Sequence, residues 1–333
     1  MNKTRYVEFD LIRCVACLLI VIMHSPMPST ESNELFLSSI SYFTAPGIGL
    51  FFMVSGALLL PIQTNISTFL KRRFTKILFP TLFWSLFYLI CKACKGNTVD
   101  WVQSILSLPF SAQGNIVLWF MYTLMGLYLL SPILSRWLQS CSKKELQFYL
   151  LLWVITLCYP LLNLILSINT HVNGILYYFT GYAGYFVLGY YCRNYAESLK
   201  WKWILPLTLL AVAAPVCCKL FSIEVDFYQV FWYLSIFVAI LCVCYFMLGI
   251  TVGKRMKPSA ALTKLSNLSF GIYLSHLFIM RTLLWNWDFI RNIDSFFLQT
   301  LVIILLTFAG SALVCYLISL LPGAQYIIGY KNK

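Results

Sequence analysis

Long apolar runs alternate with short polar connections along almost the whole chain. Each run holds about 20 mainly apolar residues, the length that a helix needs to cross a hydrocarbon core of about 30 Å. The pattern predicts ten transmembrane helices. Their expected ranges are 7–25, 41–61, 77–95, 115–135, 146–168, 175–192, 203–220, 228–250, 266–286 and 295–321.

Charge separates the connections between these runs into two sets. Most of the 24 Lys and Arg residues fall in every second connection, counted from the N-terminus. Acidic residues gather in the others: Glu31, Glu34, Asp100, Glu224, Asp226, Asp288 and Asp294. Because basic residues concentrate on the cytoplasmic side of membrane proteins, we expect an all-α, polytopic protein with both termini in the cytoplasm. One transmembrane domain over residues 1–333 accounts for the pattern.

Composition restricts the class of protein further. The chain is 60% hydrophobic and 11% charged, with a mean hydropathy of +0.80, which excludes an ordinary soluble domain. The net charge of +13 is spread over short clusters rather than one face, so nucleic acid is not expected as a partner. The three histidines show no ligand spacing with acids or cysteines, and no metal site is expected.

The first predicted helix carries ionisable residues at helical spacing. Arg13 and His24 are eleven residues apart and return to nearly the same face after three turns. Asp10 lies three residues before Arg13, so the two can pair. Ionisable groups inside a membrane are costly and mark functional sites. The alternative is that Arg13 extends to the inner headgroups while His24 merely ends the helix in the outer interface.

Several segments resemble the membrane acyltransferase-3 family, and they do so in the order that the family shows. The similar segments are FDLIRCVACLLIVIMH with its R-x10-H spacing, FFMVSGALLL from Phe51, KRRFTKILFP from Lys71, LWFMYTLMGLYLLSP from Leu118 and SFGIYLSH from Ser269. Each is weak alone, whereas the set spans residues 5 to about 285. Many members have a histidine immediately before LWF, where this chain has Val117.

The resemblance implies O-acylation of glycans at the cell surface by a protein of the bacterial inner membrane, most simply O-acetylation. We expect an acyl-CoA donor, with acetyl-CoA the simplest, and a glycan or lipid-linked saccharide as acceptor. His24 is the expected general base, because an imidazole with the ordinary pKa of about 6.5 is available in its neutral form. Catalysis is expected to involve Arg13 and Asp10 as well.

The remaining candidates divide between donor and acceptor. The expected donor-binding residues are Arg13, Lys71, Arg72, Arg73, Lys76, Ser55, Trp119 and Tyr122. A secondary site is expected from His276, Tyr273 and Arg281. For the basic cluster, the positive-inside rule alone is an equally open explanation, and Ser55–Gly56 is also typical of close helix packing.

Two other functions share these features. A transporter or flippase for lipid-linked sugars also needs polar groups inside the membrane, but needs no acyl-CoA site. The second is a non-catalytic family member that acts as a sensor or partner. Val117, in place of the histidine that many members have, leaves this function open, and such a protein would tolerate the loss of His24.

Overall fold

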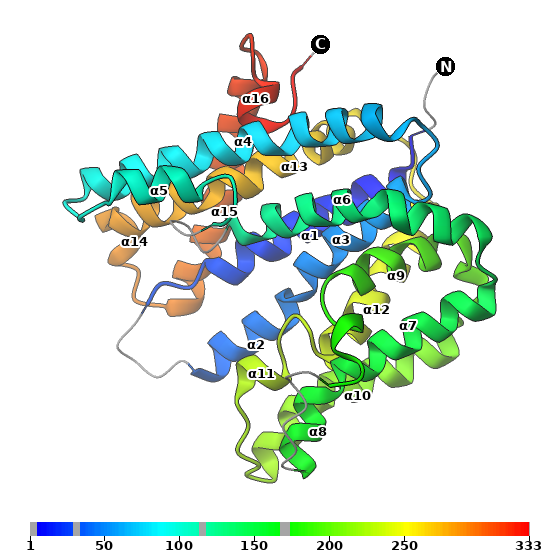
Figure 1. Ribbon diagram of the computed structural model, residues 1–333. Helices are drawn as coiled ribbons and strands as arrows, with labels where there is room; N and C mark the ends of the chain where they lie inside the picture. The colour runs from blue at the N-terminus through cyan, green and yellow to red at the C-terminus, as the bar shows by residue number, and fades with distance from the viewer. Residues whose placement is uncertain (1–4, 29–33, 113–117, 167–173, 333) are drawn as a thin grey trace. The chain divides into compact units, whose positions relative to one another are not determined.

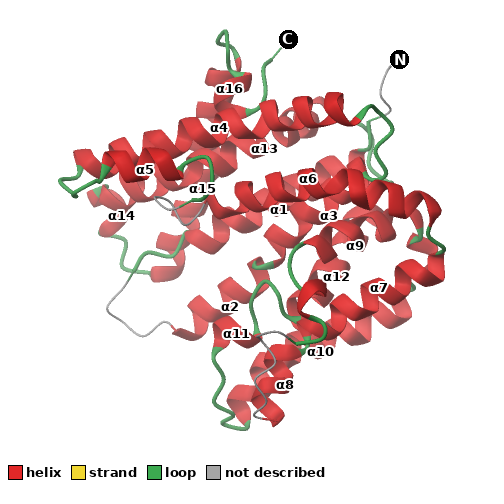
Figure 2. Ribbon diagram, viewed as in Figure 1, coloured by secondary structure: helices red, strands yellow, loops and turns green. Residues whose placement is uncertain are grey.

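The computed structural model describes residues 5–28, 34–112, 118–166 and 174–332. Every regular element in these ranges is a helix (Figures 1 and 2), which confirms the predicted all-α class. By their contacts the residues divide into two compact units, which we describe separately. The first comprises Met1–Met23, Glu31–Pro61 and Ile133–Pro258, and the second His24–Thr30, Ile62–Pro132 and Ser259–Lys333. Val117, and His171 as the third histidine of the chain, lie outside the described residues.

Among the described residues, six helical stretches are long and apolar enough to cross a membrane. They are Glu34–Leu59, Ile66–Cys94, Trp201–Leu220, Ile236–Gly253, Ala260–Asn286 and Phe296–Ser319. A seventh is reached if Lys143–Leu157 and Tyr159–Leu166, bent by 44°, form one span. The chain is thus a multi-pass membrane protein, while the count of ten spans and the cytoplasmic termini stay predictions.

The first unit is built mainly from helices of the N-terminal and central parts of the chain. They are α1 (Val7–His24), α2 (Glu34–Thr44), α3 (Pro46–Leu59), α7 (Lys143–Leu157), α8 (Tyr159–Leu166), η2 (Tyr177–Phe179), α9 (Ala183–Asn194), η3 (Ala196–Ser198), α10 (Trp201–Leu220), α11 (Phe227–Val230) and α12 (Ile236–Gly253). Helix α6 (Trp119–Ser140) begins in the second unit and ends in the first.

The tightest packing in the first unit joins α3 to α9. A Cβ atom on Gly56 would collide with the backbone carbonyl of Phe186, and one on Gly189 would collide with that of Met53. Small residues let helix backbones approach closely in a membrane, where there is little hydrophobic force between helices. Two glycines facing each other's helix therefore fix this crossing.

The second unit contains α4 (Ile66–Cys94), α5 (Trp101–Ser107), α13 (Ala260–Leu277), η4 (Phe278–Leu283), η5 (Leu284–Asn286), α14 (Asp288–Arg291), α15 (Phe296–Ser319) and α16 (Gln325–Ile328). Side chains of α4 tie it to two of these elements. The Trp84 indole donates to the Ile327 carbonyl of α16 at 3.0 Å, and the Tyr88 hydroxyl donates to the Leu274 carbonyl of α13 at 2.7 Å. Such bonds fix helices that apolar packing alone orients weakly.

Local backbone chemistry explains where the observed helices depart from the expected ranges. The range 41–61 is divided into α2 and α3 because Pro46 occupies the first turn of α3, a position that proline favours. Helix α9 begins only at Ala183, after Gly181 with φ +96°. Helix α12 begins after Ser235, whose hydroxyl accepts from the Val238 amide as an N-cap.

Candidate functional site

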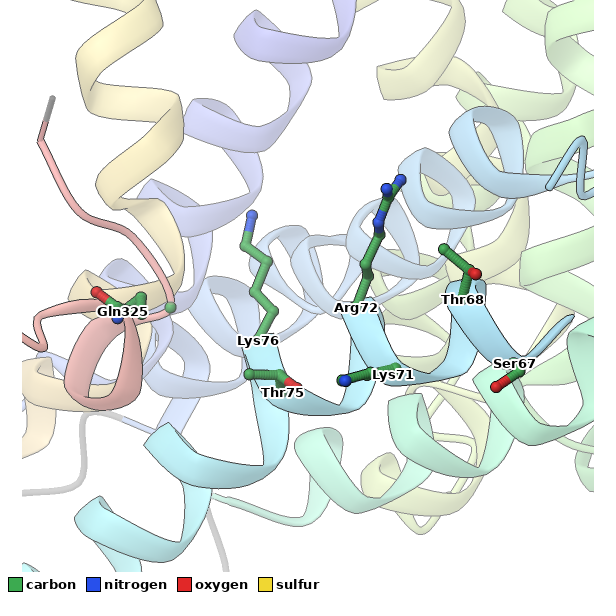
Figure 3. Close-up of a pocket in the computed structure, with 8 residues that line it drawn as sticks. Ser67, Thr68, Lys71, Arg72, Thr75, Lys76 and Gln325 are labelled. Atoms are coloured by element: carbon green, nitrogen blue, oxygen red, sulfur yellow. The ribbon is translucent and has the colours of Figure 1, made fainter. Parts of the chain in front are cut away.

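A basic cavity of about 580 Å³ opens beside the first turns of α4. Its walls are Ser67, Thr68, Lys71, Arg72, Thr75 and Lys76 of α4, together with Gln325 and Gly329. Figure 3 shows the side chains of Arg72 and Lys76 extending in the same direction from α4, with Gln325 on the neighbouring α16. Helical spacing explains the set, since residues three, four and seven apart share one face.

The described walls of the basic cavity carry cations and no carboxylate. No acidic residue is among its described walls, and within the described ranges neither Lys71 nor Arg72 has a carboxylate within ion-pair distance. The first turn of a helix adds partial positive charge from its free amide groups. This cavity is therefore suited to an anion, above all a phosphate.

The short C-terminal helix α16 and the glycine that caps it form one side of the basic cavity. Helix α16 ends at Gly329, which has φ +66° and is in the left-handed region. A Cβ there would press against the Lys76 carbonyl oxygen and the Phe270 ring, so glycine is needed for this approach. The buried carbonyl oxygen of the Gln325 side chain has no hydrogen-bond partner among the described residues.

Three of the four predicted cations line the basic cavity, and the fourth does not. The guanidinium of Arg73 lies over the Phe69 ring, 5.9 Å from its centroid. Adjacent helical residues point about 100° apart, which separates Arg73 from Arg72. Gln325 was missed by sequence reasoning, because a four-residue helix after the last apolar run carries no distinguishing pattern.

Two histidines far apart in the chain meet in the second unit. His24 is the last residue of α1, His276 lies in the last turn of α13, and their ring centroids are 5.3 Å apart. His276 is fully buried. The structure thus brings two predicted site residues together, although their pairing was not predicted.

The hydrogen bond of His276 defines which of its nitrogens is available. Its Nδ1 lies 2.5 Å from the Tyr273 carbonyl oxygen. Since a carbonyl oxygen only accepts, we assign the proton to Nδ1. Nε2 then presents its lone pair, and it has no partner among the described residues. A neutral imidazole held this way can accept a hydrogen bond or a proton.

Aromatic rings continue from the histidine pair toward α6. Tyr273 lies 5.7 Å from His276, Phe120 lies 5.5 Å from Tyr273, and Trp119 lies 6.4 Å from Phe120, measured between centroids. Phe120 belongs to the LWF segment but was not predicted to contribute. Tyr122 instead donates its hydroxyl to the Leu108 carbonyl at 2.7 Å.

α13 passes directly into a π-helical segment, η4. Such segments are rare and occur frequently at functional sites. Within η4, the Arg281 guanidinium lies over the Trp285 ring, 5.4 Å from its centroid. Arg281 was predicted to lie beyond His276 on the same helix, and the change of winding between them was not predicted.

The polar residues of α1 lie in the first unit, apart from His24. Asp10 is buried and pairs with Arg5, whose Nε is 2.5 Å and whose second guanidinium nitrogen is 3.0 Å from the two carboxylate oxygens. Sequence reasoning considered Arg13 as the partner and missed Arg5, which precedes the helix. Arg13 is half-buried, and its predicted role stays a prediction.

Ser55 also lies in the first unit, half-buried on α3. Its neighbour Gly56 makes the close contact with α9, so helix packing accounts for the small residue pair Ser55–Gly56 without a catalytic role for Ser55. A place for Ser55 in donor binding stays a prediction.

Comparison with known proteins gives one match. A family model described as an acyltransferase domain matches residues 6–320. No curated protein and no solved structure matches the chain.

Proposed function

The chain belongs to the acyltransferase-3 family and is therefore a membrane acyltransferase, and we propose that it moves an acyl group from acyl-CoA to a glycan hydroxyl. The acceptor is a cell-surface glycan or its lipid-linked precursor. The simplest donor is acetyl-CoA, which would make the protein an O-acetyltransferase of the bacterial cytoplasmic membrane.

The basic cavity is the observation that carries this proposal. Coenzyme A bears phosphates on its nucleotide end, and Lys71, Arg72 and Lys76 supply cations with no acid among the cavity's described walls. A volume of about 580 Å³ suits a ligand of nucleotide size. In the predicted topology, α4 begins at the cytoplasmic side, where acyl-CoA is made.

His24 supplies the base in this proposal. The acceptor hydroxyl oxygen attacks the thioester carbonyl carbon while an imidazole nitrogen of His24 takes the hydroxyl proton. Collapse of the tetrahedral intermediate breaks the carbon–sulfur bond, and the thiolate takes the proton from the His24 imidazolium to leave as coenzyme A, which restores the neutral base. Nε2 of His276 is left to accept a hydrogen bond from the His24 ring or from the acceptor hydroxyl.

The phosphate-binding and catalytic groups of this proposal belong to the same compact unit, which supports a shared role. The walls of the basic cavity, His24 and His276 all belong to the second unit. In the predicted topology α4 begins at the inner side and α1 ends at the outer side. An extended donor, with its phosphates at one end and its thioester at the other, matches such an arrangement.

The test compares two donors that share a thioester. Inverted membrane vesicles receive radiolabelled acetyl-CoA or acetyl-pantetheine, which lacks the nucleotide phosphates, and transfer to glycan is measured. We expect the double variant Lys71→Ala, Arg72→Ala to raise KM for acetyl-CoA about tenfold to a hundredfold, because charge-assisted hydrogen bonds are lost. KM for acetyl-pantetheine should stay constant.

Arg73→Ala is the matched control, because it removes a neighbouring positive charge whose side chain packs on Phe69 instead. It should leave both KM values unchanged. An equal rise for both donors, or an equal effect of Arg73→Ala, would contradict phosphate binding in the basic cavity. Absence of transfer with acetyl-CoA and with longer acyl-CoA donors would contradict the proposed function itself.

A further inference from the structure

A second cavity, of about 420 Å³, lies wholly within the first unit. Six of its eleven lining residues are aromatic, and we call it the aromatic cavity. These six are Tyr159, Tyr177, Tyr182, Tyr228, Trp232 and Tyr233. They come from the start of α8, from η2 and the turn before α9, and from α11 and the turn before α12; α8 and α11 are labelled in Figure 1.

The wall around Trp232 is a compact set of rings. Trp232 lies 5.0 Å from Tyr228 at an interplanar angle of 74°, and 4.4 Å from Tyr233 at 43°. Asp226 caps α11 by accepting from the Tyr228 amide at 3.0 Å. Rings that pack on one another and follow a capped helix have little conformational freedom to lose, which lowers the entropy that binding must overcome.

Buried side chains behind the aromatic cavity hold its loops in place. The Tyr185 hydroxyl donates to the Tyr233 carbonyl at 2.6 Å, and the Trp153 indole donates to the Gly181 carbonyl at 2.9 Å. Tyr185 and Trp153 are themselves buried and in edge-to-face contact at 4.9 Å. A shape supported from behind by hydrogen bonds is typical of a preorganised binding site.

The chemistry of the walls restricts the ligand. None of the described residues that line the aromatic cavity is charged, so these walls offer no cation to phosphate or carboxylate groups. The side chains of Tyr159, Thr180 and Gln229 line it and make no hydrogen bond within the described part of the chain. A purely apolar ligand would leave these groups unpaired.

We propose that the aromatic cavity binds a neutral saccharide. The apolar faces of a pyranose ring stack on Trp232 and the tyrosine rings, whose faces carry the negative end of the aromatic quadrupole. The sugar hydroxyls exchange hydrogen bonds with Gln229, Thr180 and the tyrosine hydroxyls. In the predicted topology the segments that contain Tyr177 and Trp232 begin at the outer side, where a glycan arrives.

Identification of this saccharide with the acceptor rests on the proposed function, whereas saccharide binding itself does not. Aromatic residues also gather at membrane interfaces, where they contact lipid headgroups and bind no sugar. The experiment must therefore distinguish saccharide binding in the aromatic cavity from the contact of interfacial aromatic residues with lipid headgroups.

Binding is measured by calorimetry on the full chain in lipid nanodiscs without any acyl donor. The probes are oligosaccharides of two to four neutral pyranose units, covering gluco-, galacto-, manno- and N-acetylhexosamine rings. We expect saturable binding of at least one neutral probe. Trp232→Ala should weaken it by about tenfold or more, as for a central aromatic contact, and Trp232→Phe should retain most of the affinity.

Trp287→Ala is the matched control, because Trp287 is 51% exposed in another loop that the predicted topology places on the same side. It should leave binding unchanged. Gln229→Ala, an exposed position whose loss should not disturb folding, is expected to weaken binding about fivefold through a lost hydrogen bond.

Two results would overturn the proposal: no binding of any probe by the wild type, or an equal effect of Trp232→Ala, Gln229→Ala and Trp287→Ala. Saccharide binding without acyl transfer in vesicles would uphold the cavity and contradict the proposed function. Transfer with an unchanged acceptor KM in Trp232→Ala would overturn the identification with the acceptor.

Discussion

The two cavities differ in the one property that decides what each can hold. The basic cavity has three cations and no acid among its described walls, while the described walls of the aromatic cavity carry tyrosine, tryptophan and polar side chains and no charged residue. Each is lined by one glutamine, Gln325 and Gln229 respectively. Under the two proposals, one unit of the chain recognises a charged ligand and the other recognises a neutral one.

The largest expected effect is on catalysis, and it should leave ligand binding in both cavities unchanged. We expect His24→Ala to lower kcat by about 10²- to 10⁴-fold, the usual contribution of a general base. Transfer of radiolabel from acetyl-CoA to glycan measures kcat, and calorimetry measures binding. Binding of acetyl-CoA and of saccharide should both be unchanged, because His24 lines neither cavity. Full activity in this variant would remove His24 from the mechanism.

A matched pair of isosteric substitutions tests the contrast in charge. Gln325→Glu places a negative charge in the basic cavity, and we expect it to raise KM for acetyl-CoA about tenfold through repulsion of the phosphates. Gln229→Glu adds the same charge to the aromatic cavity and should leave that KM unchanged. Steady-state kinetics measures KM for acetyl-CoA in both variants. An equal rise of KM in both would contradict the assignment of acetyl-CoA to the basic cavity alone.

Salt should affect the two cavities differently. Raising the NaCl concentration from about 0.1 to 1 M shortens the screening length from about 10 to 3 Å. We expect the affinity for acetyl-CoA to fall about fivefold, because cations at the mouth of the basic cavity are screened. Calorimetry on the same preparation should show unchanged saccharide affinity. An unchanged affinity for acetyl-CoA would mean that Lys71 and Arg72 do not contact its phosphates.

The smallest expected effect concerns the support of the basic cavity. Trp84→Phe removes the indole donor that holds the Ile327 carbonyl of α16, one hydrogen bond of about 1 kcal/mol. Because α16 carries Gln325, we expect the affinity for acetyl-CoA to fall about two- to fivefold. Saccharide affinity serves as the internal control. A wild-type affinity for acetyl-CoA would show that α16 is held without this bond.

Sequence reasoning succeeds where the predicted feature lies within a single helix. The observed α1 ends at His24, within one residue of the predicted end, since the apolar run and the following Ser–Pro define it. Likewise Lys71, Arg72 and Lys76 follow one face of α4, and the predicted basic cluster becomes the wall of a cavity. Arg73 could not be set apart, because the face that α16 covers depends on tertiary packing.

Contacts between distant segments were beyond reach of the sequence. The meeting of His24 and His276 needs the packing of two separate helices, and no spacing rule connects them. The aromatic cavity was missed for a related reason. Its tyrosines and Trp232 come from three separate segments of the chain, and near helix ends such residues are most simply explained by the membrane interface.

The π-helical segment after His276 changes how this part of the chain should be compared with relatives. Hydrogen bonds in a π-helix reach five residues back instead of four, so a helical wheel drawn from Tyr273 to Trp285 assigns the later side chains to the wrong face. The register of equivalent residues must therefore be counted separately on each side of Phe278–Leu283. A relative that forms a regular α-helix here would have one residue fewer, so its sequence would align with a gap in this segment. Its histidine would still occupy the same position in space as His276.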